Sequence, residues 1–149
     1  MRRSTAEAIA LGMMTACASA PVANPQAAGA SSQILKAART DGSAPLALKL
    51  TRDEAGRPIG FLPASEDDAD LVVVLKITDR GTSAKIFNRA REHIKLDMRI
   101  SPDGEKFAYT SSCPIRAQRD SFELWIEPIK ILEVSNPRIP NTRELGGCF

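Results

Sequence analysis

The sequence has few histidine and aromatic side chains. It contains one His, one Trp and one Tyr among 149 residues. It has no run of about 18 apolar residues, the length that a helix needs to span a bilayer, and no cluster of Lys and Arg of the kind that binds nucleic acid. Lys and Arg number 20 and Asp and Glu number 18, so the charges nearly cancel. We therefore expect no permanent membrane-spanning helix and no nucleic-acid partner.

Spacings typical of catalytic or metal-binding residues are also missing from the sequence. A Ser-His-acid triad would need His93 together with Ser111 or Ser112 and with Asp97. His93 begins a predicted strand on its polar side, where a solvated surface imidazole is the simpler interpretation. The Cys, His and acidic residues lack the close spacing of zinc ligands and the ordered spacing of an EF-hand. We expect no catalytic residue, no metal site and no cofactor, and hence no enzyme.

The first sixteen residues have the pattern of an export signal. Arg2 and Arg3 supply positive charge beside the initiator Met, and a short apolar run over residues 9–16 ends in small side chains. The segment Met14-Thr15-Ala16-Cys17 resembles the lipobox of bacterial lipoproteins, in which an apolar and two small residues precede an acylated Cys. The resemblance implies that residues 1–16 are a signal peptide and that Cys17 carries a lipid.

The lipobox resemblance also implies a location. An Asp after the acylated Cys tends to retain such proteins at the inner membrane, and Ala18 stands there instead. The expected location is the outer membrane, with the protein facing the periplasm on a stable lipid anchor. Ordinary signal-peptidase cleavage, near Ala18 or Ala20, would give a soluble periplasmic or secreted protein. An uncleaved, cytoplasmic start is the third alternative.

A linker separates this signal from the predicted domain. Residues 18–32 are Ala, Ser, Pro, Gly, Asn and Gln with a single Val and no charge. Such a segment cannot bury enough apolar surface to offset the entropy lost on ordering. We predict a flexible tether over residues 17–43 and one β domain over residues 44–149.

Apolar residues in that domain recur with a period of two, which is typical of strands. Predicted strands cover residues 46–50, 70–78, 84–87, 93–101 and 106–110. The run at 70–78 is suited to a central strand buried on both faces. Ser101-Pro102-Asp103-Gly104 predicts the turn of a hairpin, and Gly56-Arg57-Pro58-Ile59-Gly60 predicts another turn.

The segment from Ser121 to Ser135 fits two patterns. Phe122, Leu124 and Ile126 alternate as in a strand, whereas a second apolar set has helical spacing. Pro128 opposes an uninterrupted helix, so we predict two short strands, 122–127 and 129–134, followed by irregular structure. Six or seven short strands indicate an all-β fold: a small antiparallel sandwich, immunoglobulin-like, or a barrel.

The three cysteines predict one disulfide. Acylation would consume Cys17, and cleavage after it would remove it, so Cys113 and Cys148 remain in an oxidising compartment. A bridge closing a loop of about 35 residues would stabilise the fold by roughly 3–4 kcal/mol. A free buried thiol and an intermolecular bridge are the alternatives.

The loop at residues 115–120 is the best candidate for recognition. Arg116, Arg119 and the nearby Trp125 are of residue types enriched at interfaces. The alternative is that Trp125 packs in the core and the Arg pair is solvated.

Because the sequence shows no convincing catalytic group, we predict a non-catalytic cell-envelope lipoprotein that binds another envelope protein or supports an assembly. A small periplasmic inhibitor or ligand-binding module is the second hypothesis, and a hydrolase is the third.

Overall fold

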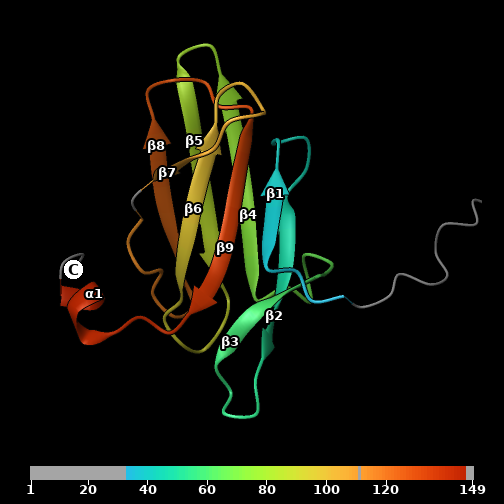
Figure 1. Ribbon diagram of the computed structural model, residues 1–149, viewed down its shortest axis with the longest axis vertical. Helices are drawn as coiled ribbons and strands as arrows, with labels where there is room; N and C mark the ends of the chain where they lie inside the picture. The colour runs from blue at the N-terminus through green and yellow to red at the C-terminus, as the bar shows by residue number, and fades with distance from the viewer. Residues whose placement is uncertain (1–32, 111, 147–149) are drawn as a thin grey trace, which may run out of the picture. The chain divides into compact units, whose positions relative to one another are not determined.

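The computed structural model describes residues 33–110 and 112–146. Within them, nine strands and one short helix follow one another along the chain (Figure 1). Their bounds are β1 Ala37–Thr40, β2 Leu46–Arg52, β3 Pro58–Pro63, β4 Leu71–Thr78, β5 Gly81–Asn88, β6 Lys95–Ser101, β7 Ala108–Thr110, β8 Arg119–Trp125, β9 Ile131–Arg138 and α1 Thr142–Gly146.

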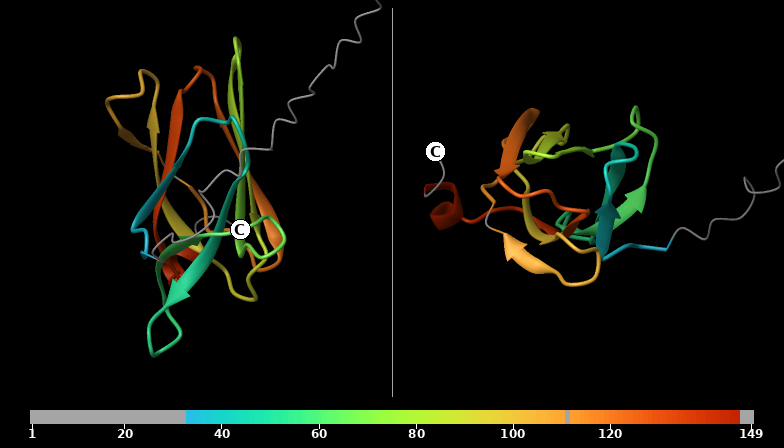
Figure 2. Two further views of the ribbon diagram at one scale, coloured as in Figure 1. Left: turned by 90° about the vertical axis from the view of Figure 1, so that its right-hand side faces the viewer. Right: turned by 90° about the horizontal axis from the view of Figure 1, so that it is seen from above.

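The strands form two antiparallel sheets packed face to face (Figure 2). One sheet has the order β1-β9-β6-β7 and the other the order β3-β2-β4-β5-β8. The predicted all-β sandwich is confirmed, and the sheets do not close into a barrel. The order differs from that of constant immunoglobulin domains, whose second and third strands lie in different sheets, whereas β2 and β3 are neighbours here.

The two sides of the sandwich are built differently. On one side, the backbone of Leu35, just before β1, pairs with that of Phe61 in β3 through hydrogen bonds of 2.8 and 2.9 Å. On the other side lie the edge strands β7 and β8, visible together in Figure 1. Among residues 33–110 and 112–146, β8 pairs with β5 on one edge and with no strand on the other.

The core lies between the sheets, because alternate residues of each strand point inward. Its largest fully buried side chains include Phe61, Leu71, Ile86, Ile94 and Leu132. The predicted strands at 46–50, 84–87 and 93–101 are confirmed, as is the hairpin joining β6 and β7. Gly104 takes a φ of 88° in its turn, which only Gly adopts without strain.

Several boundaries were wrong. Residues 37–40 fell in the predicted tether but form β1, which pairs with β9, so the folded part begins before residue 44. The predicted turn at 56–60 already contains the start of β3, and β9 continues to Arg138 beyond the predicted stop. Sequence periodicity missed β1 because this strand is short and has no large apolar side chain, and it missed β3 because Pro58, Gly60 and Pro63 are typical of turns.

The prediction for the central strand needs a further correction. β4 is buried on both faces only at its start, since Val74 and Ile77 are 37% and 39% exposed. The two strands predicted at 122–127 and 129–134 are confirmed, with their bounds shifted to those of β8 and β9.

Candidate functional site

Strand β8 presents large apolar side chains to solvent. Phe122 is 64% exposed, Leu124 is 69% exposed, and Ile126, one residue beyond the strand, is 89% exposed. Val74 of β4 lies on the same face, because it pairs with Lys85, which in turn pairs with Phe122. We call these four residues the apolar strip. Grouped exposed apolar side chains often mark an interaction site.

The register with β5 decides this orientation. Glu123 pairs with Ala84 and Trp125 pairs with Thr82, both of which are buried inward-facing residues of β5. Residues opposite each other in a sheet share a face. Trp125 therefore points inward and packs against the core, as one of the two interpretations held.

Glu123 is the charged member of this inner row. Burial raises the pKa of its carboxyl group, and the positive charge of Lys95 opposes that shift. Its side chain is half-buried and makes no hydrogen bond to any other residue in 33–110 or 112–146. Charges that point inward on an edge strand are a known protection against unselective strand pairing.

The loop that precedes β8 is held by buried polar contacts. Asn88, 1% exposed, donates from Nδ2 to the carbonyl oxygens of Ile115 (3.1 Å), Arg116 (3.1 Å) and Glu92 (2.9 Å). Gln118 donates its backbone N–H to the carbonyl oxygen of Ala90 at 3.2 Å. These bonds hold the loop in one conformation, and they fix where its arginines emerge.

Of the three residues predicted to form a recognition surface, the structure brings two together. Arg116 and Arg119 are both exposed near the start of β8, where Arg119 pairs with Asn88. Trp125 lies at the far end of the strand, about 20 Å away at the usual rise per residue. The structure therefore does not bring Trp125 together with the arginines, and binding by these residues stays a prediction.

The residues considered for a triad make structural contacts. His93 accepts at Nδ1 a hydrogen bond of 2.9 Å from the backbone N–H of Ala117, and so supports the loop before β8. Ser112 donates from its hydroxyl to the carbonyl oxygen of Leu96 at 3.1 Å; Ser111 lies outside the described residues. The described part of the chain contains no group of three His, Cys, Asp or Glu side chains suited to a metal ion.

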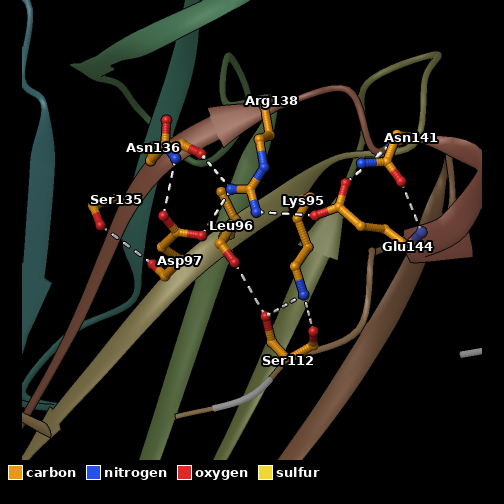
Figure 3. A network of polar contacts seen from close by, with 9 residues as sticks. All are labelled: Lys95, Leu96, Asp97, Ser112, Ser135, Asn136, Arg138, Asn141 and Glu144. Atoms are coloured by element: carbon orange, nitrogen blue, oxygen red, sulfur yellow. Dashed lines mark hydrogen bonds and ion pairs between the residues drawn. The ribbon is translucent and has the colours of Figure 1, made fainter. Parts of the chain in front are cut away.

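Asp97, the third triad candidate, belongs to a network that ties the C-terminal segment to the sheet (Figure 3). It accepts hydrogen bonds from Arg138 (2.7 Å) and Asn136 (2.9 Å), and Arg138 also bonds Glu144 of α1 at 3.1 Å. Burial acts to raise the pKa of Asp97, but the bonds from Asn136 and Arg138 outweigh it and the pKa is lowered. Asn141 and Glu144 bond each other's backbone N–H groups, which caps α1.

The outer face of the four-stranded sheet carries charged side chains, whereas β8 presents apolar side chains to solvent. Glu133 of β9, 2% exposed, accepts from Arg39 of β1 at 2.8 Å and from Arg99 of β6 at 2.7 Å. Phe107 lies beneath both guanidinium groups, 4.6 and 5.3 Å from its ring centre. The two faces of the sandwich thus offer different chemistry to a partner.

The predicted lipidation and disulfide involve residues beyond the described ranges. Cys17 and Cys148 both lie there, whereas Cys113 is exposed in the connection after β7. The Cys113–Cys148 pairing therefore stays a prediction. Among the described residues, no helix is long and apolar enough to cross a membrane.

Comparisons of the chain with protein-family models, with curated proteins and with solved structures found no match. The argument for a function thus depends on the geometry of β8 and its surroundings. Sequence alternation at Phe122, Leu124 and Ile126 indicated a strand there, but no sequence signal indicated that this row faces solvent.

Proposed function

We propose that this protein is a non-catalytic, protein-binding module of the bacterial cell envelope, and that it binds an extended segment of a partner along the edge of β8. The observation that carries the proposal is the exposure of Phe122 and Leu124 on a strand whose outer edge pairs with no other strand in the described part of the chain. A strand added at that edge would gain main-chain hydrogen bonds, and its side chains would cover the apolar strip.

Glu123 indicates what the partner strand contains. Its half-buried carboxylate has no hydrogen-bond partner among residues 33–110 and 112–146. An added strand places a side chain beside Glu123 on the inner face and others beside Phe122 and Leu124 on the outer face. The complementary segment therefore has a Lys or Arg opposite Glu123, flanked by apolar residues. A second copy of β8 complements this edge less well, because it also carries Glu123 and has few basic side chains.

The envelope location is proposed from the sequence alone. In this proposal the signal peptide is removed, Cys17 carries the lipid that anchors the protein, and a disulfide joins Cys113 to Cys148. The intact mass of membrane-extracted protein, measured with and without reduction, tests all three. A mass that includes residues 1–16 would contradict the proposed processing.

The binding proposal is tested by site-specific photo-crosslinking in the native host. A photoreactive amino acid at position 122 or 124 is expected to give one adduct, whereas the same group at position 109 gives none. Tyr109 is a matched control because it is 78% exposed on an edge strand of the other sheet. The protein in the adduct is then purified and its affinity for the full chain measured.

Charge reversal decides between strand addition and general adhesion. Glu123→Lys is expected to weaken binding about tenfold or more, since it places two cations together. Replacing the facing basic residue of the partner by Glu is expected to restore the binding of the Glu123→Lys variant. Equal adducts at 109 and 122, or a Glu123→Lys variant that binds normally, would overturn the proposal.

A further inference from the structure

A cleft of roughly 430 Å³ lies at the end of the β5–β8 strand pair, away from Trp125. It is within the range of small-molecule sites, which are about 300–1,000 Å³. Its lining residues are Phe87, Asn88, Arg89, Gln118, Arg119 and Asp120. The strip proposed to bind a partner strand does not include these residues.

Two guanidinium groups give the cleft a positive charge. Arg89 and Arg119 are both exposed, and neither forms an ion pair with a carboxylate in the described ranges. Arg89 donates from one guanidinium nitrogen to the carbonyl oxygen of Glu66, which leaves its other donors available. Asp120 is the one acidic lining residue, and Lys85 neutralises it through an ion pair of 2.7 Å.

Hydrogen bonds hold the backbone beside the cleft. Gln118 has a φ of 53°, in the left-handed region that non-glycine residues rarely adopt. Surrounding bonds must hold such a conformation, and backbone strain of this kind clusters at binding sites. Gln118 donates its backbone N–H to the carbonyl oxygen of Ala90, and buried Asn88, itself a lining residue, donates to the carbonyl oxygens of Ile115 and Arg116 in the same loop.

We propose that this cleft is a second binding site, which takes the oxyanion group of a small ligand, a carboxylate or a phosphate, between Arg89 and Arg119. A guanidinium presents paired N–H donors that match two oxygens of either group. The ring of Phe87, with Nζ of Lys85 4.7 Å from its centre, lines the cleft beside them. This site is independent of the proposed strand binding and would survive its failure.

The test is titration of the full-length protein with inorganic phosphate and, separately, with acetate, at constant ionic strength maintained with chloride. Binding is followed by calorimetry and by the arginine Nε–H signals in nuclear magnetic resonance spectra. Saturable binding of either anion is expected, and the stronger one identifies the ligand chemistry. Arg119→Gln and Arg89→Gln are each expected to weaken it about tenfold, the effect of losing a charge-assisted bond.

Arg80→Gln is the matched control, since it removes the same charge from the exposed turn at the opposite end of the β4–β5 hairpin. It is expected to leave anion binding unchanged. Arg119→Lys, which keeps the charge but loses the paired donors, is expected to bind less well than the native protein and better than Arg119→Gln. Absence of saturation, or equal weakening by Arg80→Gln, would overturn the proposal by showing only general charge attraction.

Discussion

Trp125 and Thr110 connect the two sheets on the side where β7 and β8 form the edges. The indole Nε1–H of Trp125 donates to Oγ1 of Thr110 at 3.2 Å. Trp125 also packs against the core, so its ring closes part of the gap between the sheets. The bond satisfies the indole donor of a half-buried ring, which would otherwise lose its contact with water without compensation.

Replacing Thr110 by Val is expected to destabilise the fold by about 1 kcal/mol, because it keeps the shape of the side chain and removes the acceptor. Thr110→Ser retains a hydroxyl group and serves as the control. Denaturant unfolding followed by fluorescence measures both variants, and the single Trp makes the signal specific. If the two variants unfold at the same denaturant concentration, the bond contributes nothing.

Gly81 is expected to tolerate no side chain. Its φ is 141°, and a Cβ atom there would overlap the carbonyl oxygen of Trp125. Gly81→Ala should therefore destabilise the protein by about 1–3 kcal/mol. Gly56→Ala is the control, since Gly56 also has a positive φ, 75°, but a Cβ there meets nothing within 4 Å. The difference in unfolding free energy between the two variants measures the cost of the close approach between β5 and β8. Equal unfolding free energies would contradict the prediction.

Glu123→Gln is expected to stabilise the protein at neutral pH. Burial raises the pKa of Glu123 above its usual value of 4.5, with the charge of Lys95 opposing. A carboxyl group with a raised pKa favours folding at low pH, and that contribution is lost as the pH rises through the folded-state pKa. Gln lacks the charge, so the gain should be roughly a few tenths of a kcal/mol at pH 7 and should vanish below about pH 4. Melting temperatures at both pH values test this. A variant less stable than the native protein at pH 7 would contradict it.

Glu133→Gln is expected to destabilise the protein at neutral pH. Burial acts to raise the pKa of Glu133, but hydrogen bonds from Arg39 and Arg99 outweigh it, so its pKa lies below the usual 4.5. Such a group stabilises the fold above its unfolded-state pKa, and the contribution is lost as the pH falls through the folded-state value. The substitution should cost about 1–2 kcal/mol at pH 7 and less on acidification.

Thermal unfolding from pH 7 to pH 3 measures this dependence. Glu105→Gln, the same change at an exposed position of the β6–β7 hairpin, is expected to alter little. A Glu133→Gln variant with an unchanged pH profile would show that the two ion pairs contribute no net stability.

Part of the candidate site was predictable. Arg116 and Arg119 were selected for their residue type, and the structure places both at the exposed start of β8. Arg89 was not selected, because it lies about thirty residues from Arg119 in the sequence, and only the pairing of β5 with β8 brings their ends together. The role of Asn88 was equally hidden, since one buried Asn has no sequence signature.

The sequence by itself determined where most strands lie. Alternation over residues 94–100 needs no information beyond the chain, because a period of two puts every second side chain on one face. Pro102 and Gly104 likewise place the turn of the hairpin through their own backbone preferences.

Tertiary structure decided which face of β8 is exposed. Alternating Phe122, Leu124 and Ile126 predict a strand, but the same pattern is compatible with burial or exposure of that row. Pairing with β5 put Trp125 inside and Phe122 outside, and a slip of one residue would have reversed every side chain. The apolar strip and the inward Glu123 both follow from that register, which depends on contacts between segments far apart in the chain.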